Sequence, residues 1–284
     1  MNRIIIAIFF TLTTISANGQ EVEYGSDSWV EKLSSVSVYI RTYKLINGKE
    51  YFCSKATGFF YKGHLVTNWH VLSGRNFKTG EPNKINKEQI QNETTPIDAS
   101  DPDTLEIYFN SVNLEEVKRI RIGLKDKEGQ PIWTNSKLQY HCDLATIRFN
   151  IRKITELGFI ATAVEELPLI DEYFTVPGDK VNIIGFPRGA LSTNALPFWK
   201  TCFVANDHDI EIKNLEMFYV DGTTKSGLSG SPVFQIILPL DRRNKKTVLN
   251  KSKIVFLGVY SGRRQENLNL GGVWKRNILD RMME

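Results

Sequence analysis

The stretch TGFFYKGHLVTNWHVL, residues 57–72, contains two runs of apolar residues that are separated by a lysine and a glycine at 62–63. Two such runs joined by a short glycine turn predict a β-hairpin. The second run ends at Thr67 and Asn68, which are small and polar, and His70 follows closely. The pattern predicts a histidine at a strand end, at the edge of a lobe; a core or surface histidine with a satisfied ring is the alternative.

Short runs rich in Val, Ile, Phe, Tyr and Trp continue beyond residue 33, separated by Gly, Asn, Asp and Pro, and they predict an all-β fold. The first group of runs covers residues 35–43, 56–69, 104–110, 117–124 and 143–150, and the second covers 180–186, 198–206, 208–212, 215–220, 231–238 and 253–262. Between the groups the chain is acidic and contains Pro168 and Pro177, as a crossing linker does. The sequence therefore predicts two β lobes.

We expect the first lobe at 33–165, a linker at 166–180 and the second lobe at 181–284. Residues 79–103 are polar, contain three prolines and show no sustained periodicity. A long stretch of this kind within a lobe predicts a surface insertion, and we expect one helical turn in it at 86–91.

The end of the chain has a helical spacing of apolar residues. Ile278, Leu279 and Met282 fall on one side of a helix, which predicts a short C-terminal helix packed against a lobe. The composition, with 41 % hydrophobic and 24 % charged residues among 284, is ordinary for a folded protein and sufficient for a sizeable core.

The first 19 residues have the pattern of a signal peptide. One basic residue precedes an apolar stretch that is too short to span a bilayer, and small residues stand at the positions that signal peptidase requires before Gln20. We expect cleavage there, leaving 20–32 as an N-terminal segment of an exported protein, periplasmic or extracellular; a buried N-terminal strand is the alternative. No cysteine follows the cleavage point directly and no later run is long enough to span, so no membrane anchor is expected.

The formal net charge is +4, and removal of Arg3 with the signal peptide leaves +3. A charge this small, spread in short clusters, does not predict a nucleic-acid partner. The three cysteines, Cys53, Cys142 and Cys202, allow at most one intramolecular disulfide, and their spacing is not that of a metal site. We expect neither a metal nor a cofactor.

The stretch GLSGS at 227–231 places a serine on a glycine-rich turn directly before an apolar strand. A nucleophilic serine needs such a turn, with N–H groups that converge on the developing oxyanion. The N–H groups of Gly227 and Ser229 are candidates; an ordinary turn is the alternative. Ser231 stands where the nucleophile elbow of α/β-hydrolases requires a glycine, so that fold is excluded.

A serine of this kind needs a base and an acid. Of the four histidines, His64 and His208 fall in a predicted turn and a polar loop, where we expect them to be solvated. His70 is the candidate base. Asp143 leads directly into a half-buried strand, which predicts either a strand cap or a buried carboxylate with a partner. His141 competes with His70 as that partner.

His70 and Asp143 belong to the first predicted lobe and Ser229 to the second, in the order known for chymotrypsin-type enzymes. The segments TGFFYKGHLVTNWHVL, CDLATIRF and GLSGSPVF resemble the three catalytic segments of trypsin-like serine peptidases, over about residues 35–283. The SGSP ending and the tail resemble the bacterial glutamyl endopeptidase branch most.

This resemblance implies two six-stranded antiparallel β-barrels with the active site between them and a short C-terminal helix. It implies His70 as general base and acid, Asp143 as the orienting carboxylate and Ser229 as the nucleophile. Gly227 and Ser229 then form the oxyanion hole.

The resemblance also places the S1 pocket, and the residues implied there are Thr223, Thr224, Tyr260, Ser261, Gly262 and Arg263. No acidic residue stands at the pocket base, so a strong preference for Lys or Arg is not expected. Tyr260 stands where glutamyl endopeptidases place a histidine, so their specificity does not transfer. Leu228 replaces the aspartate with which digestive relatives pair a newly cut N-terminus, so we do not expect activation by that ion pair.

Together these patterns predict an exported serine endopeptidase that acts on polypeptide substrates through an acyl-enzyme. Two alternatives remain open at this stage. One is a catalytically silent trypsin-like fold that serves as a peptide-binding module, and the other is an esterase on the same barrel.

Overall fold

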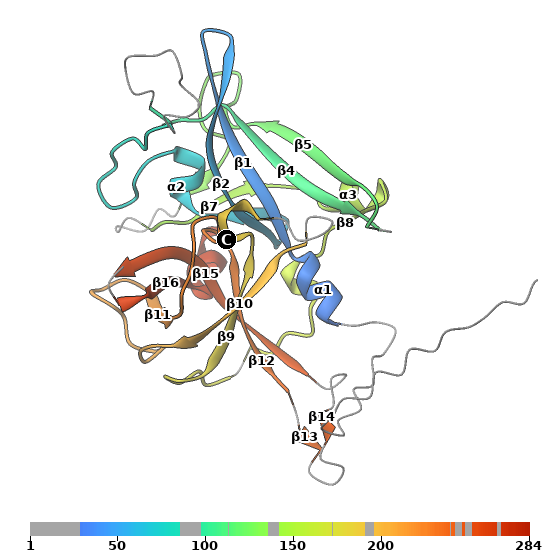
Figure 1. The fold of residues 1–284 in the computed structure, drawn as a ribbon, viewed down its shortest axis with the longest axis vertical. Helices are drawn as coiled ribbons and strands as arrows, with labels where there is room; N and C mark the ends of the chain where they lie inside the picture. Colours follow the sequence, from blue (N-terminus) through green and yellow to red (C-terminus); the bar gives the residue numbers. More distant parts are fainter. Residues whose placement is uncertain are drawn as a thin grey trace, which may run out of the picture.

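The structure is a computed structural model that describes residues 29–85, 98–112, 114–135, 142–171, 173–190, 196–238, 240–241, 246–247, 252–265 and 268–284 (Figure 1). The predicted signal peptide at 1–19, the helical turn at 86–91 and His141 lie outside these residues. In Figure 1 a sheet from the first half of the chain lies above a barrel from the second half.

One eight-stranded sheet forms the first lobe. Its strands are β1 (Ser37–Ile46), β2 (Lys49–Tyr61), β3 (His64–Thr67), β4 (Thr104–Ser111), β5 (Val117–Gly123), β6 (Thr134–Asn135), β7 (Ala145–Arg148) and β8 (Phe159–Ile160). They pair in the order β5-β4-β1-β2-β3-β7-β6, with β8 on β4, and every pair is antiparallel. The lobe therefore has more strands than the six that the resemblance implies.

The predicted hairpin is confirmed. Tyr61 of β2 pairs with His64 of β3, and the two residues between them, Lys62 and Gly63, have φ values of 45° and 73°. Two successive residues with positive φ are typical of the type I′ turn, whose twist matches that of the flanking strands. Gly63, which indicated the turn in the sequence, is the second of these two residues.

The second lobe is a closed six-stranded barrel, in the order β10-β11-β16-β15-β12-β9. Its strands are β9 (Lys180–Gly185), β10 (Phe198–Val204), β11 (Met217–Asp221), β12 (Pro232–Ile237), β15 (Lys253–Gln265) and β16 (Leu270–Lys275). A short pair, β13 (Leu240–Asp241) and β14 (Lys246–Thr247), forms a separate ribbon. Alternating apolar residues fill the barrel; Ile183, Phe218 and Val233 are fully buried in this core.

Four short α-helices complete the described fold: α1 (Trp29–Ser35), α2 (Trp69–Ser73), α3 (Arg152–Glu156) and α4 (Arg276–Met282). Two 3-10 turns lie at η2 (Val164–Glu166) and η3 (Pro187–Gly189). The predicted C-terminal helix is confirmed as α4, with Ile278 and Leu279 buried. No helix in the described ranges has the length and apolar character that crossing a membrane requires.

The prediction of a strand at 208–212 is wrong. Residues 208–210 are bends, and Ile212 forms only an isolated bridge with Leu215. The Asp207 carboxylate accepts a hydrogen bond from the backbone N–H of Asp209 at 2.9 Å, a local bond that competes with strand pairing. Residues 208–212, whose composition favours a strand, therefore lie in a loop.

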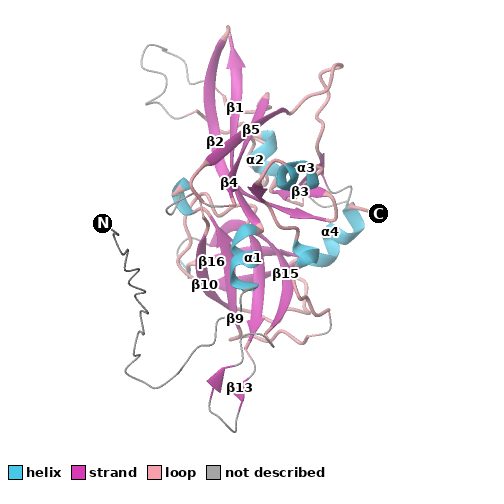
Figure 2. Ribbon diagram, turned by 90° about the vertical axis from the view of Figure 1, so that its right-hand side faces the viewer, coloured by secondary structure: helices cyan, strands magenta, loops and turns pink. Residues whose placement is uncertain are grey.

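The two lobes share one hydrophobic core. Phe59 and Tyr61 of β2 in the first lobe pack in the same cluster as Phe256 and Trp274 of the barrel and Leu279 of α4. The rings of Phe59 and Phe256 meet edge to face, with centroids 5.6 Å apart. Figure 2 shows α4 beside β15, next to the first lobe. The all-β, two-lobed fold with a C-terminal helix is confirmed.

The three cysteines are not joined by disulfides in the described structure. Burial raises the pKa of the Cys53 thiol to about 12 and that of the Cys202 thiol to about 11. Both groups are therefore protonated thiols at neutral pH, a form that is a poor nucleophile.

Candidate active site

His70 lies on α2, which begins directly after β3. The chain leaves the sheet at Thr67, passes Asn68 in an extended conformation and turns into the helix. The expectation of a histidine at a strand end is thereby refined: His70 lies on the first turn of a helix at that strand end. Its side chain is 25 % exposed, so the ring is held by the protein and still reaches solvent.

Asp143 is fully buried and is the partner of His70. Its Oδ1 accepts the backbone N–H of His70 at 2.9 Å, and its Oδ2 accepts the ring Nδ1–H at 2.8 Å. Ser261 of β15 donates its hydroxyl to the same Oδ2 at 2.5 Å. A buried carboxylate is stable only when it is paired and hydrogen-bonded, and these three donors meet that requirement.

The pairing of β3 with β7 places the two residues together. Thr67 pairs with Ala145, so the residues just beyond these strand ends, His70 and Asp143, lie side by side. Asn68 adds a bond from its Nδ2 to the backbone oxygen of Asp143 at 2.7 Å. Because a carboxylate can only accept, Nδ1 is the protonated nitrogen in the neutral form of the His70 ring, and Nε2 then carries the lone pair.

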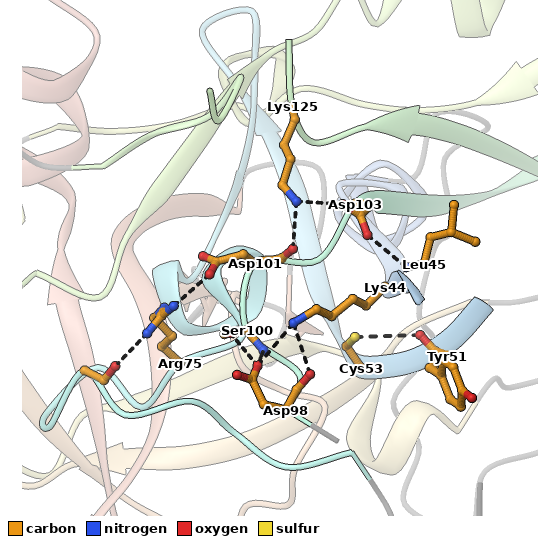
Figure 3. Close-up of polar contacts among 11 residues, drawn as sticks. Lys44, Leu45, Tyr51, Cys53, Arg75, Asp98, Ser100, Asp101, Asp103 and Lys125 are labelled. Carbon is orange, nitrogen blue, oxygen red and sulfur yellow. Dashed lines mark hydrogen bonds and ion pairs between the residues drawn. The ribbon is translucent and has the colours of Figure 1, made fainter. Parts of the chain in front are cut away.

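The segment 98–103, whose polar contacts are drawn in Figure 3, packs against the C-terminal end of α2. The backbone N–H of Asp101 donates to the oxygen of Ser73, the last residue of α2, at 2.8 Å. Gly74 follows with φ 65°, and a Cβ there would collide with the backbone oxygen of Ala99. Residues 98–103 belong to the polar insertion expected at 79–103, so that insertion packs against the helix that carries His70.

Ser229 lies on a turn that only glycines permit. Gly227 has φ 93°, and a Cβ there would collide with the backbone oxygen of Phe186; Gly230 has φ 82°, and a Cβ there would collide with Thr57. Both positions therefore exclude an L side chain on two grounds, conformation and space. The turn ends at β12, as the sequence pattern predicts.

Thr57 of the first lobe fixes this turn. Its backbone N–H donates to the oxygen of Ser229 at 2.9 Å, and its hydroxyl donates to the oxygen of Gly227 at 2.9 Å. The same hydroxyl accepts the N–H of Phe186 at 3.0 Å. Thr57 is completely buried, so both lobes hold the Ser229 turn in one position.

Within the part of the chain that the structure describes, the backbone N–H groups of Gly227 and Ser229 donate to no backbone oxygen. A nucleophilic serine needs N–H donors beside its hydroxyl to stabilise an oxyanion, and these two groups are the candidates. Leu228 between them is 1 % exposed and packs in the barrel core, so it directs no charge toward the turn.

A pocket of about 390 Å³ opens beside Ser229, and its lining residues are Arg188, Thr224, Lys225, Ser226, Ser229, Tyr260, Gly262 and Arg263. Four of the six residues implied for the S1 pocket line it. Thr223 and Ser261 do not: Thr223 is exposed, and the Ser261 hydroxyl bonds to Asp143 instead. A Cβ on Gly262 would lie 3.9 Å from Ser229 Oγ, so the pocket adjoins the hydroxyl.

The other two described histidines bond elsewhere. His64 Nδ1 lies 2.9 Å from the backbone oxygen of Lys62. His208 is half-buried and not fully solvated as expected: its side chain is 22 % exposed and its ring packs 4.9 Å from that of Phe218. Burial lowers the pKa of His208 from its ordinary value.

For several residues of this site, the sequence did not predict the position or the contacts that the structure shows. Thr57 and the Ser261–Asp143 bond join parts of the chain that are 170 and 118 residues apart, and no local pattern signals such contacts. Arg188 lies in the 3-10 turn η3, whose sequence carries no motif. Lys225 lies two residues before the glycine-rich turn, and that position was the one available signal.

A model of the trypsin-like peptidase domain family matches residues 56–236, which is more than half of the chain. The chain belongs to the trypsin-like peptidase domain family. The match contains the β2–β3 hairpin, α2, Asp143 and the Ser229 turn, and the two-lobed structure is chymotrypsin-like. A search of the curated proteins found no match.

Solved structures of bacterial proteases are similar to this trypsin-like domain. The inactive form of the Rv3671c protease of M. tuberculosis has 14 % identity and a TM-score of 0.46, with 89 % of each chain covered. A serine endoprotease from Yersinia pestis has 13 % identity and a TM-score of 0.46, covering 93 % of this chain and 66 % of its own. Similarities of this size carry no information on substrate or mechanism.

Within the described residues, no three His, Cys, Asp or Glu side chains gather as a metal site requires. Side chains and backbone groups of the chain itself supply the chemistry available at the site. These are a buried carboxylate, an imidazole oriented by it and a serine hydroxyl on a constrained turn with two orphan N–H groups.

Proposed function

We propose that the chain is a serine endopeptidase that hydrolyses peptide bonds through an acyl-enzyme, with His70, Asp143 and Ser229 as its catalytic residues. The observation that carries the proposal is the bond of 2.8 Å from His70 Nδ1 to the buried carboxylate of Asp143. That bond fixes the tautomer in which Nε2 is the base.

In the acylation step, Ser229 Oγ attacks the carbonyl carbon of the peptide bond while its proton passes to His70 Nε2. The oxyanion that forms accepts hydrogen bonds from the N–H groups of Gly227 and Ser229. The C–N bond then breaks, the leaving amine takes the proton from His70, and an ester joins the acyl group to Ser229.

In the deacylation step, water attacks the ester carbon and gives a proton to His70 Nε2. The bond between the acyl carbon and Ser229 Oγ breaks, Oγ takes the proton back, and the carboxylic acid leaves. Throughout, Asp143 stays ionised and stabilises the imidazolium, helped by the Ser261 hydroxyl.

Three further features belong to this proposal. Export through cleavage before Gln20 rests on the sequence pattern of residues 1–19, and N-terminal sequencing of the secreted protein tests it. The lobe boundaries at 33–165 and 181–284, with a linker at 166–180, are proposed from the sequence. Placement in the glutamyl endopeptidase branch rests on the SGSP ending and the tail.

Hydrolysis of casein by the purified protein and by Ser229→Ala tests the function. The alanine variant is expected to keep the far-ultraviolet circular dichroism of the native protein and to lose activity by about 10³-fold or more. Ser231→Ala is the matched control, because its hydroxyl lies two residues away and its removal leaves the nucleophile in place. Equal hydrolysis by the native protein and Ser229→Ala would contradict the proposal.

A further inference from the structure

The strand β5 has one free edge. It is the last strand of the first-lobe sheet and pairs on one side only, with β4; Figure 1 draws it at the outer side of that lobe, away from the barrel. Just before β5, the oxygen of Glu116 accepts the Ser111 N–H at 2.8 Å. Just after it, the Leu124 N–H donates to the oxygen of Asp103 at 2.8 Å. The even-numbered residues of β5 therefore bond to β4, because hydrogen bonding alternates along an antiparallel pair.

The odd-numbered residues of β5 direct their backbone N–H and C=O groups to the free edge. These residues are Val117, Arg119, Arg121 and Gly123, and all of them are exposed. Within the described residues, their edge-facing backbone groups form no hydrogen bonds. A strand edge in this state can pair with one more strand.

An exposed apolar cluster adjoins one end of this edge. Val112, Val117 and Leu157 are 70 %, 42 % and 58 % exposed. The Val112 N–H donates to the oxygen of Gly158 at 3.2 Å, which places Val112 beside Leu157. Val117 pairs with Asn110 at the same end of β4. We call Val112, Val117 and Leu157 the apolar tip; exposed apolar side chains that gather at one place are typical of an interaction site.

The charged side chains of β5 are all cationic. They are Lys118, Arg119 and Arg121, and the strand contains no Asp or Glu. Arg121 pairs with Glu50, whereas Arg119 forms no ion pair within the described part of the chain. A second copy of the chain is a poor partner, because two antiparallel β5 edges would place arginine opposite arginine. An acidic strand is the complementary partner.

We propose that the free edge of β5 and the apolar tip form a docking site for an extended segment of another polypeptide, which adds to the sheet as a further strand. The segment carries an apolar side chain beside Val117 and acidic side chains beside Arg119 and Arg121. In such strand addition, main-chain hydrogen bonds give affinity and side chains give specificity. The site is separate from Ser229, and the proposal does not depend on the proposed peptidase function.

Fluorescence anisotropy of a labelled peptide, in which one Val and two Glu alternate with Thr, tests the proposal. The Ser229→Ala protein is used so that the peptide stays intact. Saturable binding is expected, and a peptide with Lys in place of Glu is expected to bind about tenfold more weakly or worse, because like charges then face each other. Methylation of the peptide's backbone nitrogens is expected to abolish binding, because it removes the main-chain donors and keeps the charge.

Variants of Arg119 separate charge from main-chain pairing. Arg119→Gln removes the charge and is expected to weaken binding by about threefold to fivefold, as the loss of an exposed ion pair does. Arg119→Pro removes in addition an N–H that faces the edge and does not bond to β4, a position where an edge strand tolerates proline. Binding is expected to be lost in this variant. Lys253→Gln, at an exposed position on β15 in the second lobe, is the matched control and is expected to keep the native affinity.

Hydrogen exchange followed by mass spectrometry locates the bound peptide. Addition of the peptide is expected to slow exchange in β5 and to leave the segment around Ser229 unchanged. Slower exchange around Ser229 without any change in β5 would overturn the proposal, and so would equal affinity for the Glu and Lys peptides or undiminished binding of the methylated peptide. A dimer of the protein alone that Arg119→Pro dissociates would overturn it in favour of a second copy.

Discussion

At the scale of single residues, the structure assigns Thr57 a part in the active site that no motif signals. Its hydroxyl donates to Gly227 and accepts from Phe186, and its backbone N–H donates to Ser229. One buried side chain of the first lobe thus holds the Ser229 turn of the second. The precision of that turn depends on a contact between the lobes.

Thr57→Val keeps the shape of the side chain and removes the hydroxyl. It leaves the Gly227 oxygen and the Phe186 N–H without their partner, which costs about 1–3 kcal/mol of the free energy of unfolding for each group. Because the turn is displaced, kcat is expected to fall by about tenfold or more. Urea unfolding and peptide hydrolysis measure the two effects.

Thr42→Val is the control. Thr42 is equally buried, and among the described residues its hydroxyl bonds only to that of Ser54, at 3.0 Å, in the pairing of β1 with β2. This variant is expected to lose stability and keep kcat. A loss of kcat in Thr42→Val equal to that in Thr57→Val would show that the effect is general destabilisation.

The sequence singled out His70, Asp143 and Ser229, and the structure brings the first two into hydrogen-bond contact. These residues lie in short patterns with local meaning: a hairpin that ends in a histidine, an aspartate before a strand and a glycine-flanked serine. Their catalytic roles remain predictions. Local patterns could not predict the contacts of Thr57, Ser261 and Arg188 at the site. Those contacts depend on which distant segments the fold brings together.

At the scale of elements, the segment 98–103 connects α2 to the β1–β2 hairpin and to the loop after β5 through backbone hydrogen bonds and charged pairs (Figure 3). Asp103 accepts the Lys125 ammonium at 2.6 Å and the backbone N–H of Leu45 at 2.8 Å. Burial raises the pKa of Asp103, but these bonds outweigh burial, and the pKa lies below its ordinary value. The ionised form is therefore the form that stabilises the fold.

This shift predicts how stability depends on pH. The folded-state pKa of Asp103 lies below the unfolded value of about 3.9, so its stabilising effect is present above that pH and is lost as pH falls through the folded-state pKa. The native protein is expected to exceed Asp103→Asn in free energy of unfolding at pH 6, and the difference should shrink towards pH 3.

Urea unfolding at several pH values measures this difference. Lys125→Met removes the cation of the same ion pair. This variant is also expected to show a weaker dependence of the free energy of unfolding on pH in the acid range. A difference between the native protein and Asp103→Asn that stays constant from pH 6 to pH 3 would contradict the assignment of the charged pair.

At the scale of the whole molecule, the shared core makes the lobes depend on each other. The terminal helix α4 belongs to the chain of the second lobe, yet its Asp280 accepts hydrogen bonds from Tyr61 and Lys62 of the first, both at 2.7 Å. Leu279 is completely buried in the core that contains Phe59 of the first lobe. The C-terminal helix therefore stabilises both lobes together.

Leu279→Ala is expected to lower the free energy of unfolding by about 2–5 kcal/mol, because it leaves a cavity in this core. Hydrogen exchange followed by mass spectrometry should show faster exchange in peptides from both β2 and β9. Faster exchange confined to the second lobe would show that the lobes unfold independently. Met283→Ala, at the end of α4, is a control with a smaller expected effect, because its side chain is only partly buried.

The central claim is that Ser229 is a nucleophile activated by the His70–Asp143 pair. Mass spectrometry of the protein after treatment with a fluorophosphonate, with peptide mapping of the adduct, tests it most directly. We predict one adduct, on Ser229, in the native protein and a loss of labelling in His70→Ala. An unlabelled native protein, or labelling of Ser229 at the native rate in His70→Ala, would contradict the claim.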